Sequence, residues 1–185
     1  MNETAMQLEL WDKAYNWHPF TPMASYLESQ PIIITKAHGF FLVDQFGNEY
    51  IDGFSSLWCN LHGHQVPELD NALREQLQKV AHSTFLGLSN EPATILAKRL
   101  IELAPKGLTR VFYSDSGATA VEVALKMAFQ FWHQCPNPRK NKTKFLALGM
   151  AYHGDTMGDV SIGDLGRFHD MFKPLLFPTI KSLAP

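Results

Sequence analysis

Apolar residues in the middle of the chain recur at helical spacing, directly behind a short run that suits a strand. Residues 111–113 are β-branched or aromatic, which is typical of a strand. Asp115, Ser116 and Gly117 come next and can begin a helix. The apolar residues that follow with a 3.6-residue period are Val121, Leu125, Ala128, Phe129 and Trp132. Polar residues form only one narrow stripe here, so the pattern predicts a helix that is buried on more than one side.

The turn between this strand and this helix carries the candidate chemistry of the stretch. A helix start offers free backbone N–H groups and the positive dipole end, and here it has the small side chains of Ser116 and Gly117. These conditions suit an anion, above all a phosphate. Most such turns in α/β proteins bind only water, so the local pattern leaves both interpretations open. The turn matches neither GxGxxG nor a Walker loop, so dinucleotide and NTP binding are not predicted.

Three short β-branched or aromatic runs near the N-terminus indicate a small antiparallel meander. The runs span residues 32–35, 40–43 and 49–51. A short helix over residues 8–17 is predicted before them. The arm Trp17–Met23 contains two prolines, which predict an extended, rigid segment. An aromatic such as Phe20 between prolines is typically a packing anchor, and a ligand contact is the alternative interpretation.

A loop and two amphipathic helices follow the meander. Residues 52–64 show no clear period, which predicts a loop that passes close to another group. His62 and His64 lie in this loop without a third ligand nearby, so no metal site is predicted. The two helices are expected at residues 67–80 and 91–104.

A second buried-type strand, at residues 145–148, delivers another polar turn, Tyr152–Gly154. Ligands of open α/β sheets gather beyond the carboxyl ends of strands. The turns Ser114–Ala118 and Tyr152–Gly154 are therefore the places where a ligand could bind. Beyond them the pattern predicts a short helix at residues 168–172 and a strand at residues 175–180 that is broken by Pro178.

Composition narrows the class of protein. With 185 residues, 45% hydrophobic and 18% charged, the chain can form one ordinary domain with a core. A net charge of −2 and the lack of a basic run argue against nucleic acid as a partner. Cys59 and Cys135 fit no metal or redox spacing, which favours a reducing, cytoplasmic setting. Neither a signal peptide nor a membrane span is expected.

Four motifs, in order along the chain, resemble those of one enzyme family. Ser114–Ala128 resembles the phosphate-binding segment of the fold-type I, class III aminotransferases, which use pyridoxal 5′-phosphate (PLP). Tyr152–Met157 is similar to their second cofactor-contact segment. Trp17–Met23 and Asp52–Gly63 resemble the 7,8-diaminononanoate synthase branch, the aminotransferases of the biotin pathway. Each motif alone is a weak signal, and the four together make the resemblance specific.

The resemblance implies an α/β fold, the PLP-dependent transferase fold type I, in truncated form. Residues 1–66 would form an N-terminal arm and a small antiparallel meander with a substrate loop. Residues 67–185 would begin the large, PLP-binding domain with its mostly parallel sheet. The chain would then be the N-terminal part, less than half, of an enzyme that is a homodimer. Unpaired strand edges and exposed apolar surface are expected for such a part alone.

The resemblance also implies which residues contact the cofactor. The implied set is Ser116, Gly117, Ala118, Tyr152, His153 and Gly154. Ser116 and Gly117 would bind the PLP phosphate through backbone and hydroxyl donors, and Tyr152 would stack on the pyridine ring. Ala118 departs from the family, where Ser or Thr is frequent, so one donor to the phosphate would be missing.

The implied substrate contacts are Phe20, Leu57, Trp58 and Tyr152. Leu57 and Trp58 would line the pocket for 8-amino-7-oxononanoate, and Phe20 would pack against the amino donor. Members that use S-adenosylmethionine commonly have Tyr at the position of Phe20 and Trp at that of Leu57. The pattern here is closer to Bacillus-type members, some of which take lysine, so both donors stay open.

The implied activity is transfer of an amino group to 8-amino-7-oxononanoate, which yields 7,8-diaminononanoate. Two alternatives stay open: another class III ω-amino acid aminotransferase, and a non-catalytic fragment or binding module. The family's Schiff-base lysine lies beyond the equivalent of Pro185, so no catalytic residue is predicted in this chain. Lys126 is expected to pair with Glu122 instead. The 185 residues alone are expected neither to complete the fold nor to transaminate.

Overall fold

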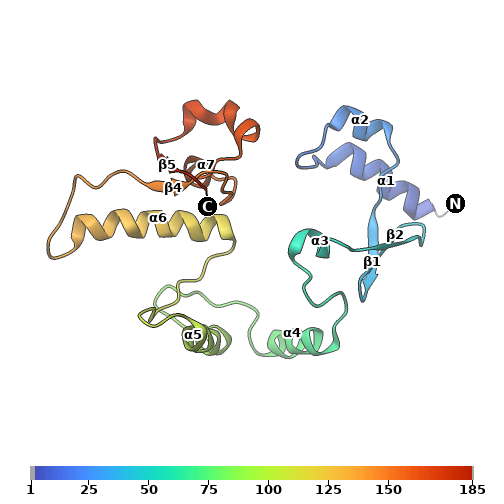
Figure 1. The fold of residues 1–185 in the computed structure, drawn as a ribbon. Helices are drawn as coiled ribbons and strands as arrows, with labels where there is room; N and C mark the ends of the chain where they lie inside the picture. Colours follow the sequence, from blue (N-terminus) through green and yellow to red (C-terminus); the bar gives the residue numbers. More distant parts are fainter. Residues whose placement is uncertain (1–2, 185) are drawn as a thin grey trace. The chain divides into compact units, whose positions relative to one another are not determined.

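The computed structural model describes residues 3–184, which divide between Asn90 and Glu91 into two units (Figure 1). The first unit holds α1 (Glu3–Tyr15), α2 (Met23–Glu28), β1 (Ile34–His38), β2 (Phe41–Asp44), β3 (Glu49–Ile51), α3 (Ser55–Trp58) and α4 (Pro67–Lys79). The second holds α5 (Glu91–Leu103), α6 (Gly117–Gln134), β4 (Leu146–Leu148), α7 (Met157–Ile162), the 3₁₀ helices η1 (Gly166–Phe168) and η2 (Asp170–Leu175), and β5 (Ile180–Ser182).

The first unit contains the predicted antiparallel meander, in the order β1-β2-β3. Asp44 ends β2 and closes the turn to β3. Its carboxylate accepts hydrogen bonds from the backbone N–H groups of Phe46 and Asn48, each at 2.9 Å, and from the Tyr50 hydroxyl at 3.0 Å. A single buried carboxylate therefore satisfies the backbone donors of this turn and fixes the register of the hairpin.

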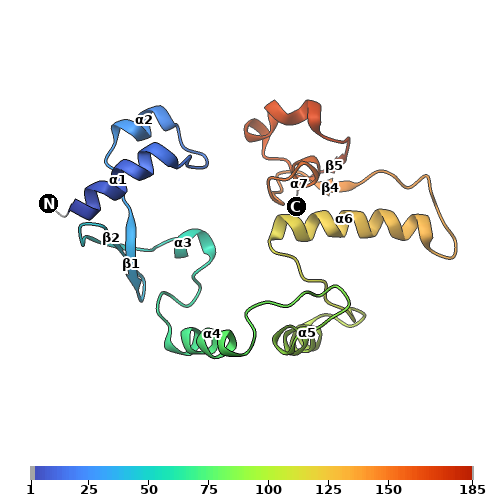
Figure 2. The same cartoon turned by 180° about the vertical axis from the view of Figure 1, so that it is seen from behind.

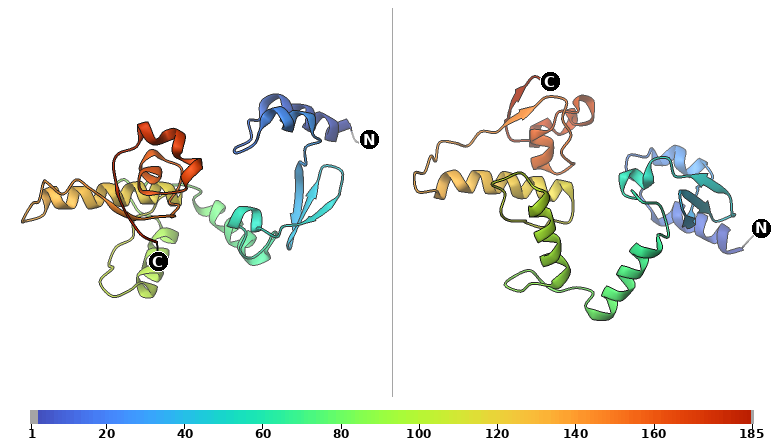
Figure 3. Two further views of the ribbon diagram at one scale, coloured as in Figure 1. Left: turned by 45° about the horizontal axis from the view of Figure 1, so that its top comes forward. Right: turned by 60° about the horizontal axis from the view of Figure 1, so that its bottom comes forward.

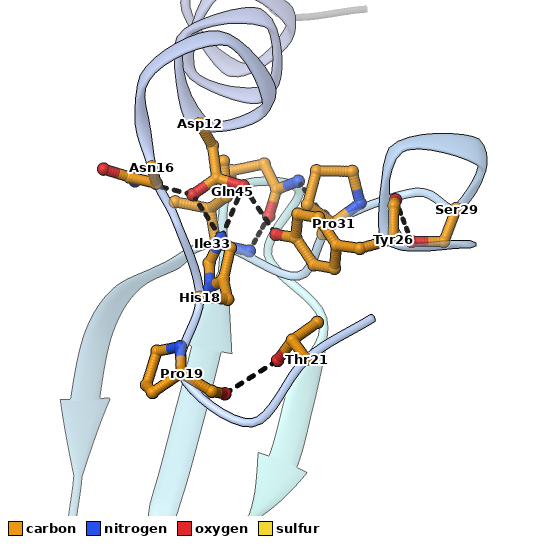
Figure 4. Close-up of polar contacts among 10 residues, drawn as sticks. All are labelled: Asp12, Asn16, His18, Pro19, Thr21, Tyr26, Ser29, Pro31, Ile33 and Gln45. Carbon is orange, nitrogen blue, oxygen red and sulfur yellow. Dashed lines mark hydrogen bonds and ion pairs between the residues drawn. The ribbon is translucent and has the colours of Figure 1, made fainter. Parts of the chain in front are cut away.

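A second carboxylate, that of Asp12 in α1, holds the start of the arm (Figure 4). It accepts hydrogen bonds from the Tyr26 hydroxyl at 2.5 Å and from the Asn16 side-chain amide at 2.8 Å, and His18 Nε2 lies 3.2 Å away. The Tyr26 bond is the largest of the effects that lower the pKa of Asp12. Burial, followed by this same bond, raises the pKa of Tyr26 to about 12.

The arm itself turns, so the prediction of an extended segment is wrong. Phe20 has a φ of 51°, and the Thr21 hydroxyl donates a hydrogen bond of 2.9 Å to the Pro19 carbonyl (Figure 4). Proline fixes only its own φ, which leaves Phe20 free to take the left-handed conformation. The packing-anchor interpretation of Phe20 is also wrong within the described residues, because its side chain is 85% exposed.

In the second unit, α7 and the β4–β5 pair lie along one side of α6 (Figures 1 and 2). The two strands are parallel, with Leu146 opposite Ile180. The loop after α6 returns beside the helix, as the tilted views show (Figure 3), and the Lys142 ammonium lies 3.6 Å from the centre of the Trp132 ring. This cation–π contact orients one of the loop's basic side chains along the helix.

Two predictions for this unit are wrong. Residues 111–113 form no strand, because no described segment pairs with them and strand geometry needs a hydrogen-bonded neighbour. The predicted strand at residues 175–180 begins only at Ile180, after η2 and Pro178, since proline cannot donate to a ladder.

The described residues bury little apolar surface. Their buried apolar residues, apart from glycines, are Ala5, Pro31, Val160 and Ile162, and no residue of α6 is buried. The prediction that α6 is buried on more than one side is therefore wrong for the described chain, where α7 and its neighbours cover one side only. Among residues 3–184, no helix combines the length and hydropathy needed to cross a bilayer.

Candidate functional site

The start of α6 is shaped by a reciprocal pair of hydrogen bonds between Ser116 and Thr119. Ser116 Oγ accepts from the Thr119 N–H, and Thr119 Oγ1 accepts from the Ser116 N–H, each at 3.1 Å. This capping box satisfies two backbone donors. Among the described residues, the N–H groups of Gly117 and Ala118 have no partner, as is usual for the first positions of a helix.

This helix start is open to a ligand. Ser116 and Gly117 are exposed, and a Cβ added to Gly117 would meet no atom within 4 Å. Ser116 Oγ also lies 3.1 Å from Thr119 Oγ1, where either hydroxyl can be the donor. Because a hydroxyl rotates, the Ser116 proton can turn from this contact toward the acceptor of a ligand. Two free N–H groups, one hydroxyl and the positive end of an 18-residue helix therefore converge at the turn.

Thr119 holds the turn through several hydrogen bonds, and the sequence analysis did not predict this role. Its hydroxyl donates to Asp115 Oδ1 at 2.6 Å and accepts from the Ser114 hydroxyl at 2.5 Å. The bond from Thr119 is the largest of the effects that lower the pKa of Asp115. The available signal was the spacing of three residues after Ser116. The usual capping-box pattern has Glu or Gln at that position, so a threonine did not match it.

The second polar turn, Tyr152–Gly154, lies against the first. Gly154 has a φ of 133°, and a Cβ on it would lie 2.6 Å from the Ala118 Cβ. Glycine is needed here both for this conformation and for the close approach. The structure thus brings together the two turns that the sequence predicted as places for a ligand.

The Tyr152 ring is held by its hydroxyl. The hydroxyl donates to Asp155 Oδ2 at 2.9 Å, and the side chain is 52% exposed. The Asp155 bond, ahead of burial, raises the pKa of Tyr152. An aromatic face is therefore fixed at one end and open to a planar ligand. His153, beside it, is half-buried.

The predicted substrate residues belong to the first unit, where two of them lie on an unusual turn. Ser55 to Trp58 all have positive φ, between 48° and 72°, so α3 is a left-handed turn made without glycine. Left-handed backbone costs about 1–2 kcal/mol per residue. The turn exposes Leu57 by 67% and Trp58 by 77%. Phe20 is likewise exposed, on the turn of the arm.

Asp52 holds this left-handed turn in place. Its carboxylate accepts from the Ser56 N–H at 2.7 Å and the Ser56 hydroxyl at 2.8 Å, and His64 Nε2 lies 2.8 Å from it. The Ser56 N–H is the largest of the effects that lower the pKa of Asp52. Sequence reasoning predicted a loop here and missed the turn, since residues 55–58 contain none of the types that favour positive φ.

The expected Glu122–Lys126 ion pair is wrong. Glu122 Oε1 accepts hydrogen bonds from the Thr156 hydroxyl at 2.6 Å and from the Gly158 N–H at 3.0 Å. No ion pair joins Glu122 to Lys126 in the described part of the chain. Two donors from α7 occupy the carboxylate, and they hold it more firmly than an exposed i,i+4 pair would.

Comparison with known proteins finds a consistent set of relatives. The family model described as Aminotransferase class-III matches residues 23–185. Adenosylmethionine-8-amino-7-oxononanoate aminotransferase from Aquifex aeolicus is 53% identical over 96% of this chain and 39% of its own length. The enzyme of the same name from Geobacter sulfurreducens is 50% identical over 95% and 38%. The chain therefore spans about two fifths of the length of these relatives.

The solved structures that resemble this chain are also aminotransferases. The crystal structure of adenosylmethionine-8-amino-7-oxononanoate aminotransferase from Methanocaldococcus jannaschii has a TM-score of 0.92 and 47% identity, over 97% of this chain and 41% of its own. The omega transaminase from Pseudomonas jessenii, solved in complex with PMP, has a TM-score of 0.86 and 28% identity, over 96% and 39%.

Proposed function

Because the chain belongs to the class-III aminotransferase family, we propose that it supplies the phosphate anchor and part of the substrate pocket of a PLP-dependent transaminase. The reaction that we propose for this transaminase converts 8-amino-7-oxononanoate to 7,8-diaminononanoate in biotin biosynthesis, with S-adenosylmethionine or lysine as amino donor. The names of the relatives support this substrate. The observation that supports the proposal most strongly is the exposed start of α6. It has free N–H groups at Gly117 and Ala118 and lies next to the turn that carries Tyr152.

The phosphate end of PLP fits the start of α6. The Gly117 and Ala118 N–H groups and the Ser116 hydroxyl donate to phosphate oxygens, while the helix dipole favours the negative charge. The missing Cβ of Gly117 leaves room for the anion. Ala118 supplies no hydroxyl, so its contribution is limited to its backbone. When bound, PLP supplies the electron sink on which transamination depends.

The ring end of PLP is assigned to the second turn. Tyr152 stacks its exposed face on the pyridine ring, and its bond to Asp155 fixes the orientation of that face. The hydroxyl of Tyr152 donates to Asp155, and this bond is the largest of the effects that raise its pKa. His153 and Gly154 flank the ring, and Gly154 sets the separation of the two turns through its contact with Ala118.

The long carbon chain of 8-amino-7-oxononanoate is assigned to exposed apolar side chains of the first unit. Leu57 and Trp58 line its pocket, and Phe20 packs against the amino donor. These exposed apolar side chains lie on turns that are fixed by hydrogen bonds, so they are suited to cover a flexible apolar substrate. None of the proposed contacts is a lysine, and we assign the lysine that reacts with the cofactor to a part of the protein outside these residues. We also infer a homodimer in the cytoplasm.

The function is tested on the complete product of the reading frame that encodes this chain. Purified protein with PLP is given 8-amino-7-oxononanoate and either S-adenosylmethionine or lysine, and 7,8-diaminononanoate is measured by mass spectrometry. We expect product with at least one donor, and no product from residues 1–185 alone. Turnover of ω-amino acids without that product would support the other aminotransferase function. Absence of any turnover and of any PLP absorption band would support a non-catalytic binding module.

A further inference from the structure

Glu122 joins the two helices that follow the two ligand turns. It lies in α6, six residues after Ser116, and its Oε1 accepts from the Thr156 hydroxyl at 2.6 Å and the Gly158 N–H at 3.0 Å. Thr156 is the N-cap of α7, and its hydroxyl oxygen also accepts from the Asp159 N–H at 3.3 Å. The carboxylate therefore completes the capping of α7 from a residue more than 30 positions away in the chain.

Gly158 is the counterpart that makes this contact possible. Its φ is ordinary, so conformation does not explain the glycine. A Cβ at this position would lie 2.5 Å from Glu122 Oε2 and 2.6 Å from Glu122 Cδ, distances that real Cβ atoms do not show. Any larger residue at 158 would displace either the carboxylate or the start of α7. Glu122 and Gly158 thus act as a matched pair.

Two contacts then define how the ligand turns meet. One is Gly154 against Ala118, at the turns themselves. The other is the Glu122 clamp, defined as the Glu122 carboxylate with Thr156 and Gly158. A rigid ligand with a phosphate at one end and an aromatic ring at the other needs a fixed separation between its two contact points.

We propose that Glu122 is a positioning residue that sets the distance between the phosphate turn at Ser116–Gly117 and the ring contact Tyr152. This inference rests on the proposed function. Glu122 touches neither turn's ligand-facing groups, so its removal leaves the phosphate donors in place. The clamp therefore matters for a ligand that spans both turns and not for one that binds at the phosphate turn alone.

The test compares two probes in the complete gene product. Pyridoxine 5′-phosphate carries both ring and phosphate but no aldehyde, so its binding does not depend on a reacting lysine; inorganic phosphate carries only the anion. Glu122→Ala is expected to weaken the ring-bearing probe by about tenfold to a hundredfold, the range for hydrogen bonds to a charged group, while phosphate affinity stays within about threefold. Glu122→Gln keeps an acceptor oxygen in place and is expected to restore most of the affinity.

The control is Glu102→Ala, which removes the same charge from the exposed Lys98–Glu102 pair of α5 and is expected to change neither affinity. Unchanged binding of pyridoxine 5′-phosphate by folded Glu122→Ala contradicts the proposal, as does an equal loss for both probes. If Glu122→Ala does not fold, Gly158→Ala tests the same pair from α7, with the same expected split. Failure of the unaltered protein to bind either probe contradicts the proposed function itself.

Discussion

Each unit contains a buried aspartate, and the two carboxylates differ in how many hydrogen bonds they accept. In the first unit, Asp44 is 4% exposed, and its carboxylate accepts hydrogen bonds from two backbone N–H groups and two side chains. In the second, Asp159 is fully buried, and neither carboxylate oxygen has a partner among the described residues. Asp44 is thus a fully hydrogen-bonded buried carboxylate, whereas Asp159 is a buried carboxylate without a partner among the described residues.

The same contrast separates the two kinds of candidate contact. In the first unit, the Asp52 carboxylate holds the turn that exposes Leu57 and Trp58. The turn that exposes Phe20 has its own hydrogen bond, from the Thr21 hydroxyl to the Pro19 carbonyl, so both turns offer side chains. In the second, the start of α6 offers unpaired backbone donors. Apolar side chains on closed turns suit an apolar substrate, and open backbone donors suit an anion. We therefore propose that the first unit contacts the substrate and the second anchors the cofactor, and the predictions that follow test this division.

The largest effect is expected from Gly154→Ala in the second unit. The new Cβ would collide with the Asp159 carboxylate and with the Ala118 Cβ at 2.6 Å, and would also force a strained φ of 133°. Overpacking and strain each cost about 1–3 kcal/mol, so we expect at least a hundredfold loss of PLP affinity and a lower Tm. Titration by absorbance and a thermal melt measure both.

Gly47→Ala in the first unit is the matched control for that variant. Gly47 also has a positive φ, of 89°, but a Cβ there would meet nothing within 4 Å. We expect only the conformational cost, about 1–2 kcal/mol, and unchanged PLP affinity. Equal losses from the two variants would show that the contact with Ala118 is unimportant.

A tenfold effect on substrate alone is expected from Asp52→Ala. Without its acceptor for the Ser56 N–H and hydroxyl, the left-handed turn relaxes to ordinary backbone and moves Leu57 and Trp58. We expect KM for 8-amino-7-oxononanoate to rise by about tenfold, while PLP affinity is unchanged, because truncation of a buried hydrogen-bond partner typically costs about that much. Steady-state kinetics measure the KM, and a parallel titration measures the PLP affinity. A change in both values would refute the division of roles.

Stability should depend on pH through Asp44. Burial acts to raise its pKa, but the four hydrogen bonds prevail and lower it to about 2. The unfolded value is about 3.9, so the charged carboxylate stabilises the fold above about pH 4, and this stabilisation is lost as the pH falls toward 2. The urea midpoint of Asp44→Asn should therefore lie below that of the unaltered protein at pH 7 and approach it at pH 2. A constant difference across this range would contradict the assignment.

Asp159→Ala is expected to raise the stability at pH 7, whereas Asp44→Asn is expected to lower it. An unpaired buried polar group costs about 1–3 kcal/mol, so its removal should raise the urea midpoint at pH 7, provided that no other part of the complete protein pairs with it. We expect a gain of about 1 kcal/mol, the smallest effect of the series. A loss of stability would instead indicate that Asp159 has a partner in the complete protein, and would remove this contrast with Asp44.

The fold class and the local elements could be predicted from the sequence. The resemblance to fold-type I transaminases is confirmed by solved structures that match almost the whole chain. The meander and the helices at α4, α5 and α6 follow from hydrophobic period and turn residues, which are local properties. The two polar turns could be located for the same reason, since each lies next to a periodic segment, and their role as ligand contacts stays a prediction.

Contacts between distant residues could not be predicted in this way. The sequence around Glu122 indicates only that Lys126 lies one helical turn away. Nothing in this local pattern predicts the hydrogen bonds that Glu122 accepts from Thr156 and Gly158. The left-handed turn at Ser55–Trp58 depends on Asp52 and has no glycine to signal it. The missing strand at residues 111–113 shows the same limit, because a strand needs a partner that its own sequence does not specify.

The central claim is that the start of α6 anchors the phosphate of PLP, and Gly117→Asp tests it most directly. A carboxylate at this open position would repel the phosphate and fill its space. The control, Gln130→Asp, adds the same charge to the same helix about 20 Å further along its axis. In the complete gene product we expect Gly117→Asp to weaken PLP binding by at least about a hundredfold and Gln130→Asp to leave it unchanged. Equal PLP affinity in Gly117→Asp and the unaltered protein would contradict the account.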